Sequence, residues 1–402
     1  MTHSTGAAPP RDRFIDGLRG LALGGVLVVN SMSFPHVFSS PIGVVDPPDS
    51  STALAVHAFC AAVFQAKSYP LLMFLVGYAW AMRVRRRRGT TIADVASTRR
   101  RQMLRQGMLG VLHGMFVYFG DILSWLALLG VMLIGAPRVR LRRLCARFRL
   151  WGAIWLLFGG ATCLWLILGG EPLPGTGHWL TDARSWSDVF ALQRIAYASF
   201  VFQVPWQVPM MLALGTLGVL AGRLRILERA RLGARVWRLG VSVALPIGIV
   251  ANALLALWVI RLQRESGGDL TPSDLSSQFA GPVLALGLVC LLAREWHAGR
   301  AQWLGAFVPL GRMTMSCYIA HTLTCMVLFA GPAGALAPRF GSVGLFGFGL
   351  AFWVCAVALA PVWQAQFGTG PLERWVRAGW GRPRAPSEPG AGPSPSRRNT
   401  IT

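Results

Sequence analysis

Long apolar runs alternate with short, mostly basic polar segments from residue 14 to about residue 365. Runs of this length are typical of helices that cross a bilayer. The pattern therefore predicts an all-α, polytopic transmembrane helical bundle of about ten spans. The predicted spans are 14–34, 53–82, 105–119, 122–136, 150–168, 206–222, 239–260, 279–293, 309–330 and 343–365.

The run 53–82 is too long for a single straight crossing. As one helix it would be roughly 45 Å long, against a hydrocarbon core of about 30 Å. Pro70 lacks an amide hydrogen, so it interrupts helical hydrogen bonding and frees the carbonyl of Ala66. We therefore expect an outer segment, 53–66, and a separate leg that begins at residue 68 and reaches the cytoplasm.

The stretch 104–136 has arginines on both flanks, so both of its ends are expected in the cytoplasm. It must then be a hairpin, and its polar break is Gly120-Asp121 in HGMFVYFGDILSW. Each leg has only about sixteen residues, roughly 24 Å, so the turn is expected below the outer surface. A carboxylate at that depth requires a partner.

The charge is strongly one-sided, with a net charge of +23 from 38 arginines and a single lysine, Lys67. With the N-terminus inside, 33 arginines fall in cytoplasmic segments and five in outer ones. This bias orients membrane helices, and it predicts both termini in the cytoplasm. The charge then indicates no nucleic-acid partner, although anionic membrane lipids remain expected neighbours of the arginines.

The domain organisation is simple. Residues 1–13 form a polar cytoplasmic tail without the features of a signal peptide. Residues 14–380 form one membrane domain, and the Pro-, Ser- and Gly-rich tail 382–402 is expected to be disordered. An interfacial helix is expected within the long outer segment 169–205. The seven cysteines are scattered without metal-ligand spacing, so no metal site and no disulfide framework is indicated.

Six polar residues map to the outer half of the predicted membrane. Such residues are costly in lipid, and their convergence indicates a site. They are Asn30, His36, Lys67, His113, Asp121 and His321.

Five of these residues also have a structural explanation. Lys67 could extend its ammonium group to the outer headgroups. His113 and His321 could join neighbouring helices by hydrogen bonds. His36 could be a solvated residue after Pro35, and Asp121 could cap the helix that follows it by accepting from the amide of residue 123 or 124.

A further polar pair lies at the cytoplasmic entrance of the first span. Asp16 and Arg19, in FIDGLRG, are three residues apart and can pair on one helical face. The pair could anchor the N-terminal end of the span. It could also contact the phosphates of a cytoplasmic donor.

Five motifs occur in a characteristic order along the chain: FIDGLRGLALGGVLVVN, KSYPLLMFLVGYAWAM, VLHGMFVYFGDILSWLALLG, LGRMTMSCYIAHTL and FGTGPLERWVR. Over residues 13–380 the chain resembles the YeiB-like family of bacterial inner-membrane proteins, whose C-terminal part, here about 225–380, is labelled DUF418. That family is distantly similar to transmembrane acyltransferases, namely the heparan-sugar N-acetyltransferases and the acyltransferase-3 proteins. Those proteins move an acyl group from cytoplasmic acyl-coenzyme A to an acceptor across the membrane, with histidine at the centre of the chemistry.

The resemblance implies candidate positions residue by residue. Asn30 occupies the place of an asparagine at the end of the first span of the acyltransferases. Lys67, His113 and Asp121 match the K-x-x-P-L, L-x-H and G-D-I-L elements of the YeiB-like pattern. The family usually has glutamine where this chain has His321, which makes that residue a weaker candidate for catalysis.

The resulting hypothesis is acyl transfer to a hydroxyl or amine of a small-molecule, glycan or lipid-linked acceptor. His113, or alternatively His36, would act as base, with Asp121 orienting it. Asn30 and Lys67 would serve the oxyanion or the acceptor, and Asp16 and Arg19 would lie near the phosphates of acyl-coenzyme A. The alternatives are a transporter of a small anion or lipid-linked metabolite, with Lys67 as charge partner, and a non-catalytic membrane scaffold.

Overall fold

The computed structural model describes residues 12–37, 51–86, 92–168, 178–203, 207–265 and 271–378. The predicted tails 1–13 and 382–402 lie almost wholly outside these ranges. The described chain is helical apart from the two-residue strands β1 (His36–Val37) and β2 (His178–Trp179). These strands pair antiparallel with His36 opposite Trp179.

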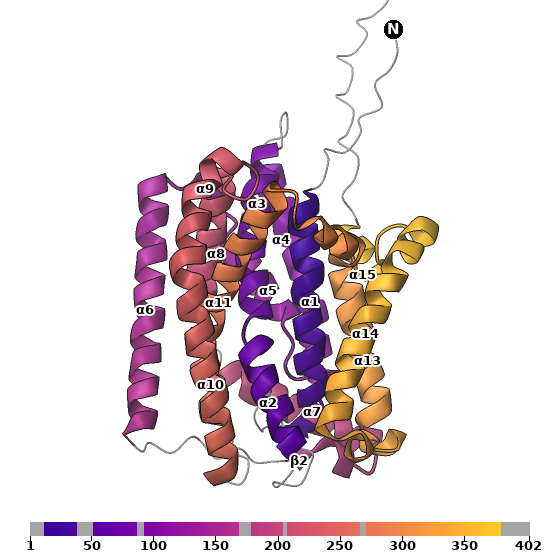
Figure 1. Cartoon of the computed structure of the whole chain (residues 1–402). Helices are drawn as coiled ribbons and strands as arrows, with labels where there is room; N and C mark the ends of the chain where they lie inside the picture. Colours follow the sequence, from indigo (N-terminus) through magenta and orange to yellow (C-terminus); the bar gives the residue numbers. More distant parts are fainter. Residues whose placement is uncertain are drawn as a thin grey trace, which may run out of the picture.

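The helices pack side by side in one bundle (Figure 1). The first group is α1 (Arg13–Ser33), α2 (Ser51–Val63), α3 (Ser68–Arg86), α4 (Ile92–Phe116), α5 (Leu123–Met132), α6 (Leu141–Ile167), α7 (Trp186–Gln203) and α8 (Val208–Leu224). The second is α9 (Ala230–Leu239), α10 (Leu245–Glu265), α11 (Thr271–His297), α12 (Val308–Gly311), α13 (Thr314–Phe329), α14 (Ala337–Phe367) and α15 (Pro371–Arg377). A π-helical segment, Gly240–Ala244, joins α9 to α10.

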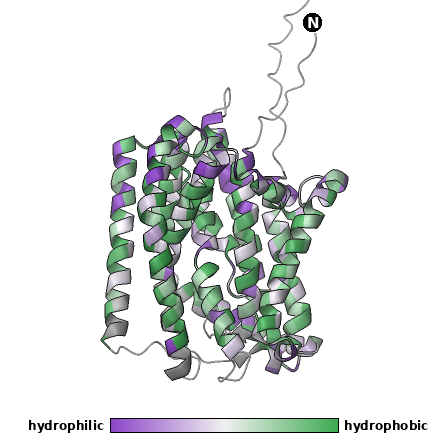
Figure 2. Ribbon diagram, in the orientation of Figure 1, coloured by the Kyte–Doolittle hydropathy of each residue, from purple (hydrophilic) through white to green (hydrophobic). Residues whose placement is uncertain are grey.

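The helices consist mostly of hydrophobic residues between the two ends of the bundle (Figure 2). Large hydrophobic side chains are exposed there, including Leu157 at 72%, Leu359 at 64% and Val354 at 62%. An aqueous surface rarely presents such a continuous belt, whereas lipid solvates it. Within the described ranges, five helical segments are long and apolar enough to cross a membrane: Arg13–Ser33, Ser51–Arg86, Ala230–Arg261, Gln278–His297 and Ala337–Phe367. The chain is an integral membrane protein.

The long run 53–82 is broken where the sequence predicts. α2 ends at Val63, residues 64–67 form turns, and α3 begins at Ser68. Ala66 takes a positive φ of 55°, a left-handed conformation that cannot continue an α-helix. Pro70 then lies in the first turn of α3, where its missing amide hydrogen costs no helical hydrogen bond.

The predicted hairpin is also present, although its first leg is longer than expected and begins at Ile92. α4 ends at Phe116 and α5 begins at Leu123, so the turn between them contains Gly120 and Asp121. The two legs approach closely at Gly110 of α4. A Cβ there would lie 2.3 Å from the Ser124 nitrogen and 2.7 Å from Asp121 Oδ2, so only glycine allows this approach.

Glycines also bring α3 and α8 together. A Cβ on Gly77 would lie 2.0 Å from the Gly215 carbonyl oxygen, and one on Gly218 would lie 2.0 Å from that of Phe74. Lipid tails are as apolar as the helix surfaces, so the hydrophobic effect does not drive helices together inside a membrane. Helices there associate through close packing, which small residues allow. α1 packs against α3, α12, α13 and α14, which places it inside the bundle.

The expected helix in the outer segment is α7. It begins with a capping box, in which the Asp188 amide donates to Ser185 Oγ at 3.2 Å and the Ser185 amide donates to Asp188 Oδ2 at 2.9 Å. α7 lies at the end of the bundle away from the start of α1 (Figure 1). It packs against α4 and β1.

Candidate functional site

The last turn of α4 and the α4–α5 turn place a histidine beside a carboxylate. His113 Nδ1 lies 3.0 Å from Asp121 Oδ1. The two side chains are 3% and 0% exposed, so the pair is screened from solvent. The His113 carbonyl oxygen accepts from the amides of Val117 and Tyr118, which ends α4 and turns the chain back toward Asp121.

Asp121 has a second set of contacts. Its Oδ2 accepts from the amide of Ser124 at 2.8 Å and from the Ser124 hydroxyl at 2.7 Å. Asp121 therefore caps the start of α5 and contacts His113 at the same time. The structural and functional interpretations of this residue are compatible, because each uses a different carboxylate oxygen.

The other ring nitrogen of His113 faces a hydroxyl that the sequence patterns did not single out. His113 Nε2 lies 2.8 Å from Thr322 Oγ1, and Thr322 is 0% exposed. Thr322 lies on α13, so this contact joins elements 209 residues apart in the chain. We call Asp121, His113 and Thr322 the Asp–His–Thr chain.

The direction of these hydrogen bonds follows from the donor inventory. A carboxylate can only accept, so Asp121 places the ring proton of His113 on Nδ1. In the neutral ring the lone pair is then on Nε2, directed at the Thr322 hydroxyl. A carboxylate that orients a histidine whose second nitrogen meets a hydroxyl is the arrangement by which enzymes activate a nucleophile.

Two further polar residues border the Asp–His–Thr chain. The ring centroids of Tyr318 and His113 are 5.1 Å apart, and the Tyr318 hydroxyl donates to the Gly120 carbonyl oxygen at 3.5 Å. The Asn30 side chain lies against that hydroxyl. Asn30 is 7% exposed, and among the described residues its Nδ2 has no hydrogen-bond partner. A buried amide donor without an acceptor can receive the oxygen of a bound group.

His321 belongs to a neighbouring contact between α13 and α1. Its Nε2 lies 2.9 Å from Ser31 Oγ, and the Ser31 hydroxyl also reaches the Leu27 carbonyl oxygen at 2.9 Å. The ring packs against Phe348 and Phe352. This is the helix-joining arrangement that the sequence offered as the structural alternative for His321.

Lys67 is buried at the α2–α3 break, with 5% of its surface exposed. Its ammonium group donates to the Ala61 carbonyl oxygen at the end of α2, so it folds back onto α2. No carboxylate among the described residues lies within 4.0 Å of it. The described contacts do not connect Lys67 to the Asp–His–Thr chain.

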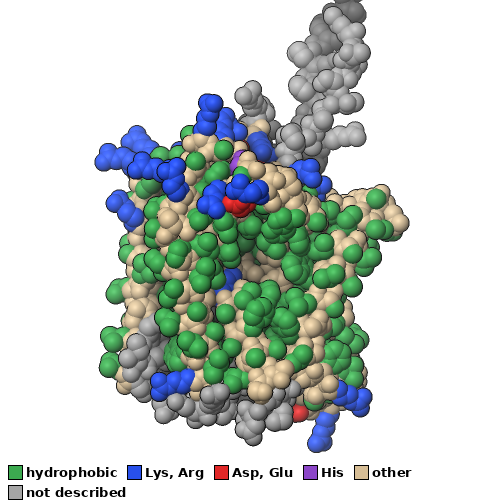
Figure 3. Space-filling view, in the orientation of Figure 1, with side chains coloured by type: hydrophobic (Ala, Val, Ile, Leu, Met, Phe, Trp, Pro, Cys, Tyr) green, Lys and Arg blue, Asp and Glu red, His purple; other side chains and the backbone are tan. Residues whose placement is uncertain are grey.

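The break itself is held between two helices. Gly25 of α1 faces the Ser68 hydroxyl, and Gly281 of α11 faces the Ala66 carbonyl oxygen. Figure 3 shows a hollow in the apolar belt about half-way between the two ends of the bundle, with a Lys or Arg side chain inside it. The α2–α3 break lies at this height (Figure 1).

The remaining predicted residues lie at the two ends of α1. Asp16 pairs with Arg19 at 3.5 Å, as expected, and also with Arg312 at 3.3 Å. Arg312 was not predicted, because it is 296 residues distant in the chain. His36, in β1, follows the other end of α1, and its side chain lies outside the described part of the structure.

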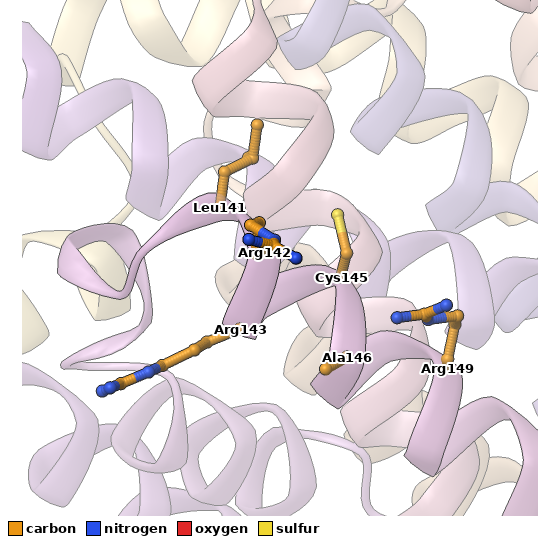
Figure 4. Close-up of a pocket in the computed structure, with 6 residues that line it drawn as sticks. All are labelled: Leu141, Arg142, Arg143, Cys145, Ala146 and Arg149. Carbon is orange, nitrogen blue, oxygen red and sulfur yellow. The ribbon is translucent and has the colours of Figure 1, made fainter.

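A separate pocket lies in the first turns of α6. Its lining is Leu141, Arg142, Arg143, Cys145, Ala146 and Arg149. The guanidinium groups point in different directions (Figure 4). The pocket shares no residue with the Asp–His–Thr chain.

The fold and the site define a class of protein: an integral membrane helical bundle with a buried carboxylate–histidine–hydroxyl chain. Residues 221–382 match the family described as "Protein of unknown function (DUF418)". The chain is 24% identical over 403 residues to "Uncharacterized protein YeiB" of Escherichia coli (strain K12), covering 91% of this chain and 95% of that protein. It is also 24% identical over 406 residues to "Uncharacterized protein YxaH" of Bacillus subtilis (strain 168), covering 90% and 92%. The YeiB-like resemblance predicted from the five motifs is confirmed.

Proposed function

We propose that this protein is a membrane acyltransferase. The observation that carries the proposal is the Asp–His–Thr chain, in which Asp121 orients His113 and leaves Nε2 facing a hydroxyl at 2.8 Å. Acyl transfer to a hydroxyl or amine requires a base that removes a proton as the new bond forms. His113 is the base, and Asp121 fixes its tautomer and stabilises the imidazolium that forms.

The carbonyl oxygen of the acyl group gains negative charge during transfer and needs a donor. We assign this role to the buried Nδ2 of Asn30, which makes no hydrogen bond of good geometry among the described residues and can turn from the nearby Tyr318 hydroxyl to a bound oxygen. The Tyr318 ring packs on the His113 ring. The atoms balance in a direct transfer. The acceptor oxygen or nitrogen bonds to the acyl carbon, the carbon–sulfur bond breaks, and the coenzyme A thiolate takes the proton from His113.

The topology that suits this reaction has ten spans with both termini in the cytoplasm of a bacterial inner membrane. The arginine bias supports it, because 33 of 38 arginines fall on that side. Figure 3 shows basic side chains gathered at the end of the bundle where α1 begins. Cysteine-accessibility labelling of single-cysteine variants in intact cells tests this orientation.

Acyl-coenzyme A would enter at that basic end. Arg19 and Arg312 flank Asp16, and their side chains are 30% and 31% exposed, so a phosphate can approach both guanidinium groups from the surface. Asp16 precedes Asn30 by fourteen residues on α1, about 21 Å along the axis. The phosphates would thus stay at the surface while the thioester extends inward to the Asp–His–Thr chain.

The acceptor would bind toward the opposite half of the membrane. Lys67 is a buried ammonium group without a carboxylate partner among the described residues, so an anionic group on the acceptor would compensate its charge. His36 would lie near the same entrance. A lipid-linked or glycan acceptor fits this placement.

The experiment is acyl transfer from labelled acetyl-coenzyme A in membranes that contain the protein, with the lipid and glycan fractions analysed for label. We expect transfer with the wild type and a loss with His113→Gln and with Asp121→Asn. His297→Gln is a matched control, because His297 contacts the Leu227 carbonyl oxygen and Trp237 instead of the site. Wild-type transfer by both site variants would overturn the assignment of the base.

A transporter is the second candidate, and the buried Lys67 at a helix break favours it. Broken helices with an unbalanced charge at mid-depth are common in transporters. That function predicts movement of an anionic solute without covalent change, and it predicts that His113→Gln still transports while Lys67→Gln does not. Mass spectrometry of the acceptor fraction separates the two functions.

A further inference from the structure

We propose that Thr322 carries the acyl group, so that transfer proceeds in two steps through an ester on its Oγ1. This inference rests on the proposed acyl transfer and adds a covalent carrier to it. Thr322 was not among the residues predicted from the sequence. It lies on α13, whereas the histidine and carboxylate that would activate it come from α4 and the α4–α5 turn.

The contact geometry is that of an activated nucleophile. The Thr322 hydroxyl lies 2.8 Å from His113 Nε2, and the opposite ring nitrogen lies 3.0 Å from Asp121. Both distances are within the range that nucleophile–base–carboxylate systems require. The carbonyl oxygens of Tyr318 and Ile319, 3.2 Å and 3.1 Å from the Thr322 hydroxyl, are alternative acceptors for its single proton, which points to His113 Nε2 in the reactive arrangement.

A second threonine on α13, Thr324, serves as a comparison because its hydroxyl has only a structural role. Thr324 Oγ1 donates to the Ala320 carbonyl oxygen at 2.8 Å, and the residue is only partly buried. It has the usual bond of a threonine to its own helix, and among the described contacts it has none with a histidine. Thr322 has backbone carbonyls within the same reach, but its single hydroxyl proton has a second acceptor, His113 Nε2, whose ring is oriented by a buried carboxylate.

Access to the base favours a carrier over direct transfer. His113 Nε2 is covered by Thr322, and the three residues of the chain are between 0% and 3% exposed. An acceptor hydroxyl could reach Nε2 directly only by displacing the threonine. An acyl group can instead be attacked by the hydroxyl that already occupies the place in front of the base.

The depth of Thr322 in the bundle explains why a covalent carrier would be needed. Thr322 lies eight residues beyond the start of α13, about 12 Å along the helix axis. The Asp–His–Thr chain then lies between the two substrates. The donor phosphates would bind beside Asp16, and the acceptor would bind in the other half of the bundle. A two-step reaction lets donor and acceptor visit the site in turn, so neither polar molecule has to cross the membrane.

The two steps conserve atoms and protons. In the first, Thr322 Oγ1 bonds to the thioester carbon, His113 Nε2 takes the hydroxyl proton, the carbon–sulfur bond breaks, and coenzyme A leaves as the thiol with the proton from His113. In the second, the acceptor oxygen or nitrogen bonds to the ester carbon and gives its proton to His113, which returns it to Thr322 Oγ1 as the ester bond breaks.

The test incubates the purified full-length protein with acetyl-coenzyme A or palmitoyl-coenzyme A in the absence of acceptor. Acid-quenched protein is digested and the α13 peptide is analysed by tandem mass spectrometry, while released coenzyme A is measured in parallel. We expect one acyl group per chain on Thr322 and one equivalent of released thiol. Thr322→Ser should retain the label, Thr322→Val and His113→Gln should lose it, and Thr324→Val should match the wild type.

The outcomes separate this inference from the proposed function. Acyl transfer to lipid or glycan by Thr322→Val at more than about a tenth of the wild-type rate, with no label on α13, would overturn the carrier and leave the acyltransferase intact. Label on another residue would have the same meaning. If the folded wild type takes up no label from either donor and transfers none to an acceptor, both proposals fail together.

Discussion

Ser316 Oγ lies 2.5 Å from Glu373 Oε2, and this hydrogen bond ties the short helix α15 to the first turn of α13. The other carboxylate oxygen accepts from the amides of Met315 at 2.7 Å and Ser316 at 3.2 Å. Glu373 is 3% exposed, so a charge-assisted cap closes the end of the helix that carries Thr322. The position of Thr322 therefore depends on a residue 51 places further along the chain.

Replacement of this cap should loosen α13. We expect Glu373→Ala to lower the free energy of unfolding by about 1–3 kcal/mol, because three donors lose their acceptor. Acyl transfer should fall as well, since the first turn of α13 is no longer held. Thermal unfolding in detergent measures the first effect. Glu295→Gln is the control, because Glu295 pairs with Arg294 and Arg300 at the surface; an equal loss of stability in that variant would contradict the cap.

Gly110 offers a way to move Asp121 without changing any polar group. A Cβ at this position would lie 2.7 Å from Asp121 Oδ2 and 2.3 Å from a backbone nitrogen, so Gly110→Ala must push the hairpin legs apart. We expect acyl transfer to fall about 10-fold or more, because a misplaced carboxylate no longer orients His113.

The matched control is Gly107→Ala, one turn earlier on α4. A Cβ there meets only the Ala127 side chain at 3.5 Å, an ordinary van der Waals contact. We expect wild-type activity and expression from this variant. Equal activity in the two alanine variants would show that the closeness of α4 and α5 does not matter for the site.

The hairpin turn is also held from α7. Gln193 Oε1 accepts from the Phe119 amide at 2.9 Å, and Gln193 is 0% exposed. Gln193→Leu leaves that buried amide without its acceptor, so we expect a loss of about 1–3 kcal/mol in stability. Gln193→Glu keeps an acceptor and should retain more activity than Gln193→Leu. Hydrogen exchange of the 117–122 amides measures the loosening directly.

The apolar, all-helical fold and its two breaks could be predicted from the sequence because their signals are local. Hydropathy locates the apolar helices, and the placement of Pro70 locates the α2–α3 break. The polar pair Gly120-Asp121 marks the hairpin turn. Each of these features depends on residues within one or two turns of one another.

The site could be predicted only in part, for a physical reason. His113 and Asp121 are eight residues apart and carry ionisable groups, so both their cost in lipid and their proximity across a turn can be recognised. Thr322 and Ser31 carry no charge, and hydroxyls are ordinary in membrane helices, where they bond to their own backbone. Their contacts with His113 and His321 depend on how α13 is rotated against α4 and α1. That rotation is set by packing between distant segments, as is the pairing of Arg312 with Asp16.

The capping box of α7 gives a pH-dependent prediction outside the membrane spans. Hydrogen bonds from the Ser185 hydroxyl and amide hold the pKa of Asp188 below its ordinary value. A lowered pKa in the folded state means that the stabilisation is present above the ordinary value of about 4 and is lost as the pH falls through the folded value. The difference in melting temperature between the wild type and Asp188→Asn should be constant from about pH 7 to pH 5 and should vanish at lower pH.

Substitutions at Lys67 separate the contribution of its charge from that of its side-chain shape. Lys67→Arg keeps the positive charge, but a planar guanidinium group does not fit where a compact ammonium group folds back onto the Ala61 carbonyl. We expect this variant to lose most of its activity while retaining near-normal insertion. Full activity in both single variants, Lys67→Arg and Lys67→Gln, would show that Lys67 does not bind the acceptor.

The hairpin that reverses half-way through the bundle has an evolutionary consequence. α4 and α5 together bring the histidine and carboxylate to mid-depth and go no further, so the space beyond them is open to a separate element, and α7 packs there against α4. α7 contributes a support to the turn through Gln193 but none of the three residues of the Asp–His–Thr chain. Sequence drift in α7 can therefore reshape the approach to the centre while the chemistry is inherited unchanged, and we expect relatives with different acceptors to diverge first in this helix.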